Sequence, residues 1–86
     1  MATHKSAKKR ARQDLVRRAR NRDKRSRVRR AIRAARAAIA EGDAATVATT
    51  VRQAESLLRR ATSKGVLHSK TASRQISRLT KAANGI

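Results

Sequence analysis

Lysine and arginine are the residues of this chain that could do chemistry, and they are concentrated near its N-terminal end. Sixteen of the 24 Lys and Arg residues lie within the first 36 positions, together with only two acids, Asp14 and Asp23. This segment carries a net charge of +14, out of a formal +19 for the 86 residues. Charge of this density repels itself, and a polyanion that neutralises it favours the compact state. The pattern therefore indicates nucleic acid, which adds a phosphate with every nucleotide.

The kinds of side chain favour contacts to phosphate. Arginine outnumbers lysine seventeen to seven, and a guanidinium group can bind a phosphate through two hydrogen bonds. Around residues 17–25 the cations point in every direction about a helix axis, which suits burial among several backbones better than one DNA groove. The sequence contains no Phe, Tyr or Trp, so it lacks the stacking platforms of single-strand binders. We expect phosphate contacts to supply affinity and the shape of a folded RNA to supply specificity.

The sequence contains no residue pattern typical of a catalytic site or a metal site. The five acids are scattered, cysteine is absent, and no glycine-rich phosphate loop occurs. His4 and His68 are 64 positions apart, whereas acid–base catalysis needs a second group within reach. We assign no role to His4, and we interpret His68, in a helix connection, either as a capping or packing residue or as an RNA contact. We predict no enzymatic activity, cofactor, metal or small-molecule substrate.

Helices must position the cations. The chain has no proline, and alanine and arginine, both strong helix formers, dominate it. Gly42, Gly65 and Gly85 each follow a stretch with helical spacing of apolar residues, as a glycine at the end of a helix does. The sequence therefore predicts an all-α fold with helices over about 6–41, 44–64 and 69–84.

Apolar residues at steps of three and four mark the inward face of each predicted helix. Ser6 and Asp43 are the predicted N-caps of the first two helices, and Val66 and Leu67 are expected to cover the end of the bundle. The predicted core positions are Val28, Ile32, Ala35 and Ile39, then Val47, Val51, Ala54, Leu58 and Ala61, then Ala72, Ile76, Leu79 and Ala83.

Unequal helix lengths predict a projecting arm. At ~1.5 Å per residue the helices span roughly 53, 30 and 23 Å. The short link at Gly42 and Asp43 allows only an antiparallel hairpin, which pairs the second helix with about residues 22–41. The first twenty or so residues then have no helix beside them. We predict one domain, an antiparallel three-helix bundle with an overlong, basic N-terminal helix projecting from it.

The core is expected to be thin. Of the 33 hydrophobic residues, 18 are alanine and only 14 are Leu, Ile or Val. With no disulfide to reinforce so short a chain, we expect marginal stability and a basic arm that is partly disordered in the free protein. No apolar run approaches the ~18 residues of a membrane span, and no secretory signal is apparent. We expect a cytoplasmic protein that forms no homo-oligomer.

Two blocks of sequence resemble a known family. Lys5-Ser6-Ala7-Lys8-Lys9-Arg10 stands near the start, and residues 64–74 read Lys-Gly-Val-Leu-His-Ser-Lys-Thr-Ala-Ser-Arg, followed by Ser77-Arg78-Leu79. In these blocks, and in length, glycine positions and charge layout, the chain resembles the twentieth ribosomal protein of the bacterial small subunit. Lys70, Thr71 and Ile76 depart from the asparagine and the two basic residues that are usual in that family.

The resemblance implies a three-helix bundle that binds small-subunit ribosomal RNA early in assembly, in the 5′ domain and at the long penultimate stem, without a cofactor or a catalytic role. That RNA and the small ribosomal subunit are then the expected partners. The residues expected to bind RNA are Lys5, Lys8, Lys9, Arg10, Arg12, Arg17, Arg18, Arg20, Arg22, Lys24, Arg25, Arg27, Arg29, Arg30, Lys64, His68, Lys70, Arg74 and Arg78.

Two other functions share part of this pattern. A histone-like DNA-compacting protein would have the same charge and alanine content, but such proteins usually dimerise or insert apolar wedges. A membrane-active cationic helix needs a wide apolar face, whereas residues 5–27 offer only Leu15 and Val16 as large apolar groups. The histone-like protein is the alternative that we retain.

Overall fold

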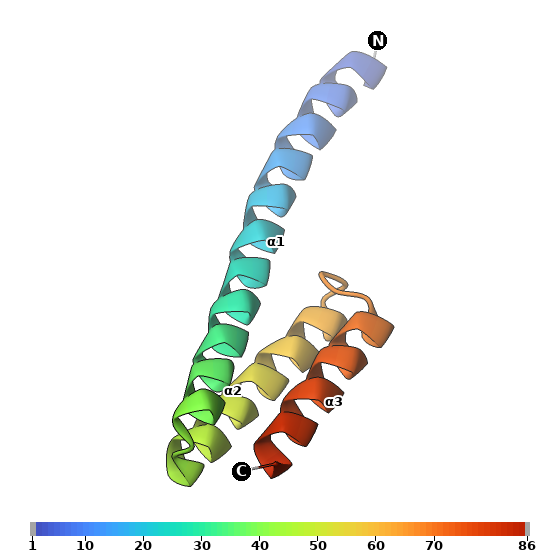
Figure 1. Ribbon diagram of the computed structural model, residues 1–86. Coiled ribbons are helices and arrows are strands. Elements are labelled where there is room, and N and C mark those ends of the chain that lie inside the picture. Colours follow the sequence, from blue (N-terminus) through green and yellow to red (C-terminus); the bar gives the residue numbers. More distant parts are fainter. Residues whose placement is uncertain (1, 86) are drawn as a thin grey trace.

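Three helices make up the part of the chain that the structure describes. The structure is a computed structural model, which describes the backbone of residues 2–85 and the side chains of residues 6–85. The helices are α1 (Ala2–Glu41), α2 (Ala44–Ser63) and α3 (Ser69–Asn84). They form an antiparallel bundle in which α1 and α3 each pack mainly on α2 (Figure 1). The prediction of an all-α bundle with a long first helix is confirmed.

The first helix begins earlier than predicted. Because α1 starts at Ala2, Ser6 lies in its second turn and not at its N-cap. The four residues before Ser6 include no glycine or proline that would interrupt a helix. The side chain of Lys5 lies outside the described residues, so its predicted RNA contact has no structural counterpart here.

A left-handed glycine and an N-cap form the turn between α1 and α2. Gly42 has a φ of +78°, and its N–H donates to the carbonyl oxygen of Ala38 at 3.0 Å, which closes α1. Asp43 then caps α2, as predicted: its Oδ1 accepts from the Ala45 N–H at 3.2 Å, and its Oδ2 accepts from the Thr46 hydroxyl at 2.6 Å. The Thr46 hydroxyl, followed by the backbone N–H groups, holds the pKa of the Asp43 carboxyl below its usual value.

The Asp43 cap predicts a pH dependence of stability. Because its folded-state pKa is lowered, the carboxylate stabilises the fold above the unfolded-state value of 3.8, and this contribution is lost as pH falls through the folded-state pKa. Asp43→Asn keeps a capping oxygen that does not titrate. We expect the difference in Tm between wild type and Asp43→Asn to shrink as pH falls below about 4. Thermal unfolding followed by circular dichroism measures it, and a difference independent of pH would contradict the cap.

The end of α2 is closed by a Schellman motif. Gly65 has a φ of +74°, its N–H donates to the Thr62 carbonyl at 3.0 Å, and the Val66 N–H donates to the Ala61 carbonyl at 2.8 Å. Val66 and Ala61 are both buried in one cluster, which supplies the apolar contact of this motif. Gly85 closes α3 differently, with a right-handed φ of −79°.

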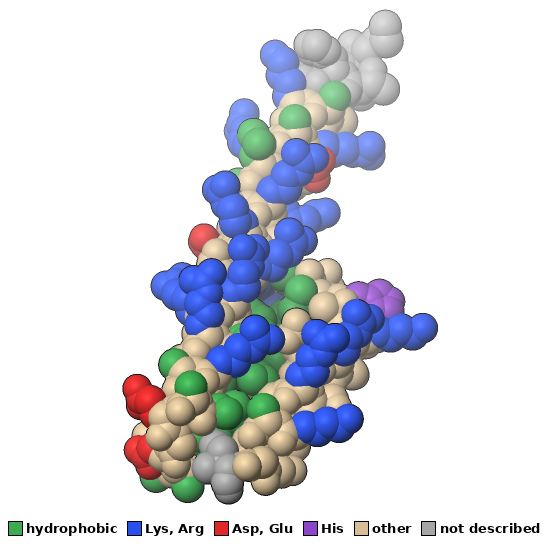
Figure 2. All heavy atoms as spheres, viewed as in Figure 1, with side chains coloured by type: hydrophobic (Ala, Val, Ile, Leu, Met, Phe, Trp, Pro, Cys, Tyr) green, Lys and Arg blue, Asp and Glu red, His purple; other side chains and the backbone are tan. Residues whose placement is uncertain are grey.

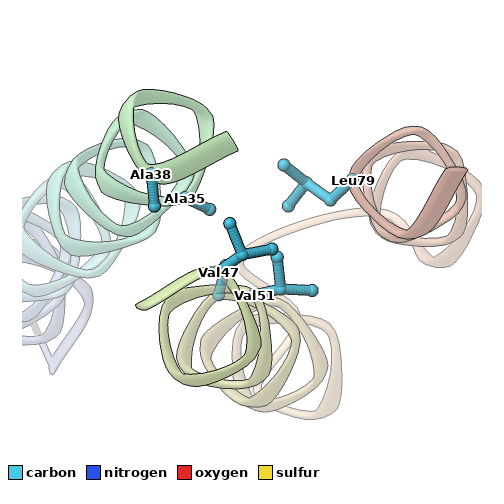
Figure 3. Packing of buried hydrophobic residues seen from close by; sticks show 6 residues of the cluster. Ala35, Ala38, Val47, Val51 and Leu79 are labelled. Carbon is cyan, nitrogen blue, oxygen red and sulfur yellow. The ribbon is translucent and has the colours of Figure 1, made fainter. Parts of the chain in front are cut away.

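The core is small and built mostly from alanine and valine. Figure 3 shows Ala35 and Ala38 of α1 facing Val47 and Val51 of α2, with Leu79 of α3 completing this cluster. The small alanine side chains let α1 approach α2 closely. A second cluster lies nearer the α2–α3 turn and consists of Val28, Leu58, Ala61, Val66 and Ala72.

The predicted core positions are confirmed most fully in α2, where all five are buried. In α1, Val28 and Ala35 are buried, but Ile32 and Ile39 are half-buried, and Ala38, which was not predicted, is buried. In α3, Ala72 and Leu79 are buried while Ile76 and Ala83 are half-buried. The outer helices therefore contribute narrower buried faces than α2, which lies between them.

The N-terminal part of α1, residues 2–20, projects from the bundle and is called the arm below. The molecule measures 63 × 20 × 13 Å, and its radius of gyration is 17.5 Å, against ~12 Å for a compact chain of this length. All side chains from residue 6 to residue 20 are exposed. Since none of the described side chains of the arm is buried and like charges at four-residue spacing repel, partial disorder of the arm in the free protein stays a prediction.

Candidate nucleic-acid interface

The predicted RNA-binding residues lie on the surface of the arm, the rest of α1, the α2–α3 turn and α3. Of the 18 whose side chains the structure describes, 17 are exposed and Lys24 is half-buried, so a ligand can reach them without disturbing the core. Figure 2 shows Lys and Arg side chains along both sides of the arm and over α3. Acidic side chains lie at the opposite end, where α1 turns into α2, and a few also lie along α1.

A groove separates the base of the arm from the α2–α3 turn. It has a volume of about 670 Å³. On the α1 side its walls carry Arg12, Arg17, Arg20 and Lys24, and on the other side they carry Lys64 with Gly65. We call it the arm groove. Positive charge on two walls provides a channel that a negatively charged backbone can enter from the open side.

The arm groove continues the core-facing side of α1. At steps of four residues, Arg20, Lys24, Val28 and Ile32 succeed one another along one side of the helix. Val28 is buried and Ile32 is half-buried, whereas Arg20 and Lys24 line the groove. The same helix face thus changes from apolar to cationic where the bundle ends. Before that point in the sequence, the face lines the groove with cations, with the polar Gln13 and Asn21, and with Val16, which is 46% exposed. After that point it packs on α2.

The third helix carries a second basic stripe. Lys70, Arg74 and Arg78 are exposed at four-residue spacing, on the side of α3 opposite the buried Ala72 and Leu79. Lys81 extends the same stripe by one turn and is also exposed, although it is not among the predicted RNA-binding residues. Counting turns of the helix from Arg78 would have identified it. The arm and this stripe are therefore two separate basic surfaces held by one bundle.

His68 has a structural role. It is the N-cap of α3, and its Nδ1 accepts a hydrogen bond from the Lys70 N–H at 3.2 Å. The capping interpretation is confirmed. With Nδ1 as the acceptor, the neutral ring carries its proton on Nε2. Because the side chain is exposed, Nε2 can still donate to an anion, and the RNA contact of His68 stays a prediction.

The structure brings some predicted residues together and leaves others apart. Lys24 and Lys64, forty positions apart in the sequence, line the same groove. The cations that precede the groove, Lys8, Lys9 and Arg10, lie further out on the unaccompanied arm (Figure 1). Arg60 of α2, absent from the predicted set, lines a pocket together with Lys24 and Lys64.

Among the described residues, no three His, Asp or Glu side chains are grouped so that they could hold a metal ion. Within the same part of the chain, no helix combines the length and the apolar character needed to cross a membrane.

Comparison with known proteins gives a consistent result. The family model for Ribosomal protein S20 matches residues 2–84. A protein of Nitratidesulfovibrio vulgaris (strain DP4), named Small ribosomal subunit protein bS20, is 51% identical over 86 residues, covering 100% of this chain and 99% of its own length. Proteins of the same name from Solidesulfovibrio magneticus and Koribacter versatilis are 52% and 56% identical, over 98% and 93% of this chain and 94% and 90% of their own.

Proposed function

The chain belongs to the ribosomal protein S20 family, whose members are structural, non-enzymatic constituents of the small ribosomal subunit, and we propose that it binds small-subunit ribosomal RNA directly. In this proposal the cations contact phosphates, the protein recognises the shape of the folded RNA, and its binding stabilises that fold during assembly. The 5′ domain and the penultimate stem, which the sequence resemblance implies, are the proposed sites on the RNA.

The observation that carries the proposal is the unaccompanied basic arm with a groove at its base. The arm has no helix beside it, and all of its described side chains are exposed. A helix that gains nothing from packing and is opposed by its own charge needs an external polyanion to be stable. RNA phosphates on several sides of the arm, and in the arm groove, would supply that neutralisation.

Shape recognition follows from the two basic surfaces. Phosphate contacts alone carry no sequence information, and the chain has no aromatic residue on which an unpaired base could stack. Once the arm is helical, the bundle holds it and the α3 stripe at a fixed relation to each other. Only an RNA whose backbones lie at the matching separation meets both surfaces at once, so the folded target is preferred over a linear polyanion.

The proposed RNA-binding residues are those of the arm, of α1 up to Arg30, of the α2–α3 turn and of the α3 stripe. The partner is the small ribosomal subunit, which in bacteria is a cytoplasmic particle. We propose no small-molecule substrate, no membrane partner and no homo-oligomer.

A competition titration tests this function. Labelled small-subunit ribosomal RNA is bound to the protein and challenged with unrelated folded RNA of equal length and with duplex DNA, at about 50 and 200 mM salt. We expect a preference for the ribosomal RNA of at least about tenfold at both salt concentrations, because only the folded target meets the arm and the α3 stripe at once. Equal competition by all three nucleic acids would contradict the proposal and favour a histone-like polycation.

A further inference from the structure

A small pocket in the seam between α1 and α2 is surrounded by four cations. Lys24 and Arg27 of α1 face Arg60 and Lys64 at the end of α2 around a volume of about 190 Å³. The apolar floor includes Val28, which is buried. At ~30 Å³ per water molecule, the pocket has room for about six waters, and so for the five heavy atoms of a phosphate group with a few waters.

The positive charges around this pocket are not neutralised by acidic side chains that line it. Of the described residues that line it, none is acidic. Arg60 lies in the last turn of α2 and Lys64 is its C-cap, where the helix macrodipole offers about half a negative charge. That partial charge is small against four full positive charges. Like charges on facing helices repel, so the packing of α1 on α2 is opposed here unless an anion enters.

The cations project from a fixed backbone. Lys64 directly precedes the left-handed Gly65, and the hydrogen bonds from Gly65 to Thr62 and from Val66 to Ala61 fix the backbone around it. Lys24 stands one turn before the buried Val28 on α1. Two guanidinium groups can grip an oxyanion through paired hydrogen bonds, while the two ammonium groups act as point charges.

We infer that this pocket, called the phosphate seat below, binds one backbone phosphate of the RNA and that its occupation stabilises the packing of α1 on α2. The inference rests on the proposed function. Lys24 and Lys64 line both the phosphate seat and the arm groove, so a backbone that follows the groove reaches the seat. RNA binding and correct seating of the long helix on the bundle are then one coupled event, because a ligand of the folded state alone stabilises that state.

Inorganic phosphate probes the seat without RNA. The Tm of the full-length protein is measured by circular dichroism as phosphate replaces chloride at constant ionic strength and near-neutral pH. We expect a rise in Tm that grows with the logarithm of the phosphate concentration and reaches about 4–8 °C at concentrations several-fold above the dissociation constant. Arg60→Gln should lose at least about half of this rise, because it removes one of the four charges and one of the two guanidinium forks.

Arg52→Gln is the matched control for Arg60→Gln. Arg52 is also an exposed arginine of α2, but it lines a different groove, against α3. It should show the full wild-type rise. Lys64→Gln serves as a second variant of the seat. Equal rises in Tm in all four proteins would contradict binding at the phosphate seat, because phosphate would then be acting as a general stabiliser of compact states. The absence of any rise in Tm in wild type would also contradict it.

A second measurement separates the seat from the proposed function. In RNA titrations, Arg60→Gln should reduce the slope of log affinity against log salt by up to ~0.7–0.9, the value for one lost phosphate contact, while Arg52→Gln leaves it unchanged. An unchanged slope in Arg60→Gln, with wild type still preferring the ribosomal RNA, overturns the seat and leaves the proposed function standing. A wild type without that preference contradicts the proposed function, although phosphate stabilisation lost in Arg60→Gln would still support an anion site.

Discussion

Deleting residues 1–20 is expected to abolish tight binding to ribosomal RNA while leaving the bundle folded. The deletion removes eight Lys and Arg residues. If each contacts one phosphate, the slope of log affinity against log salt falls by about 6, at ~0.7–0.9 per contact. Affinity at moderate salt should then fall by on the order of a thousandfold or more. Binding titrations over a series of salt concentrations give both quantities.

The stability of the bundle should be unaffected by this deletion. All described side chains of the arm are exposed, and both core clusters begin at or beyond Val28. Circular dichroism should show the loss of helix from the arm alone and a thermal transition close to that of wild type. A full-length variant with the same eight cations replaced by Gln keeps the chain length without the charge. Wild-type affinity in either variant would contradict the role of the arm.

Leu58→Asp is expected to unfold the bundle. Leu58 is only 1% exposed and packs in the second cluster with Val28, Val66 and Ala72. The substitution removes the largest fully buried side chain and places a carboxylate among apolar groups, at a cost of about 2–5 kcal/mol or more. A domain of this size has a total stability of roughly 4–13 kcal/mol, and this core is thin. Thermal denaturation should show a cooperative transition that is strongly lowered or lost.

Leu15→Asp is the control, with the same chemical change on the arm. Leu15 is 66% exposed, so its replacement should alter stability by no more than about 0.5 kcal/mol. The pair separates the loss of core packing from the change in net charge, which is the same in both variants. An undiminished transition in Leu58→Asp would mean that a different face of α2 packs inward.

Much of the fold was predictable because its determinants are local. Gly42 and Gly65 occupy backbone conformations that glycine favours, and Asp43 caps the helix that follows. The two ends of α2 are therefore determined by short stretches of sequence. The four-three spacing of Val47, Val51, Ala54, Leu58 and Ala61 identified the buried face of α2 completely. The short link between α1 and α2 imposed the hairpin, and the excess length of the first helix then implied the arm.

Other features could not be predicted, for physical reasons. Ser6 has the chemistry of an N-cap, but the helix runs past it because nothing before it interrupts the backbone hydrogen bonds. Ala38 is buried and Ile39 only half-buried, because the rotation of α1 about its axis is decided by close packing of alanine against α2. His68 could have been a cap or an RNA contact by residue type, and the Nδ1 hydrogen bond to Lys70 shows the cap.

By itself, the sequence determined the three helices, the ends of α2, the inward face of α2 and the concentration of positive charge on an unaccompanied arm. These features depend on helical period and charge count, which involve near neighbours along the chain. Only the tertiary structure decided that Lys24 lines the same pocket as Arg60 and Lys64. Residues 37–63 are neutral overall, so the distribution of charge along the sequence gives no sign that Arg60 belongs to a basic surface. The offset between α1 and α2, set by the turn and by side-chain packing, brings these distant cations around one pocket.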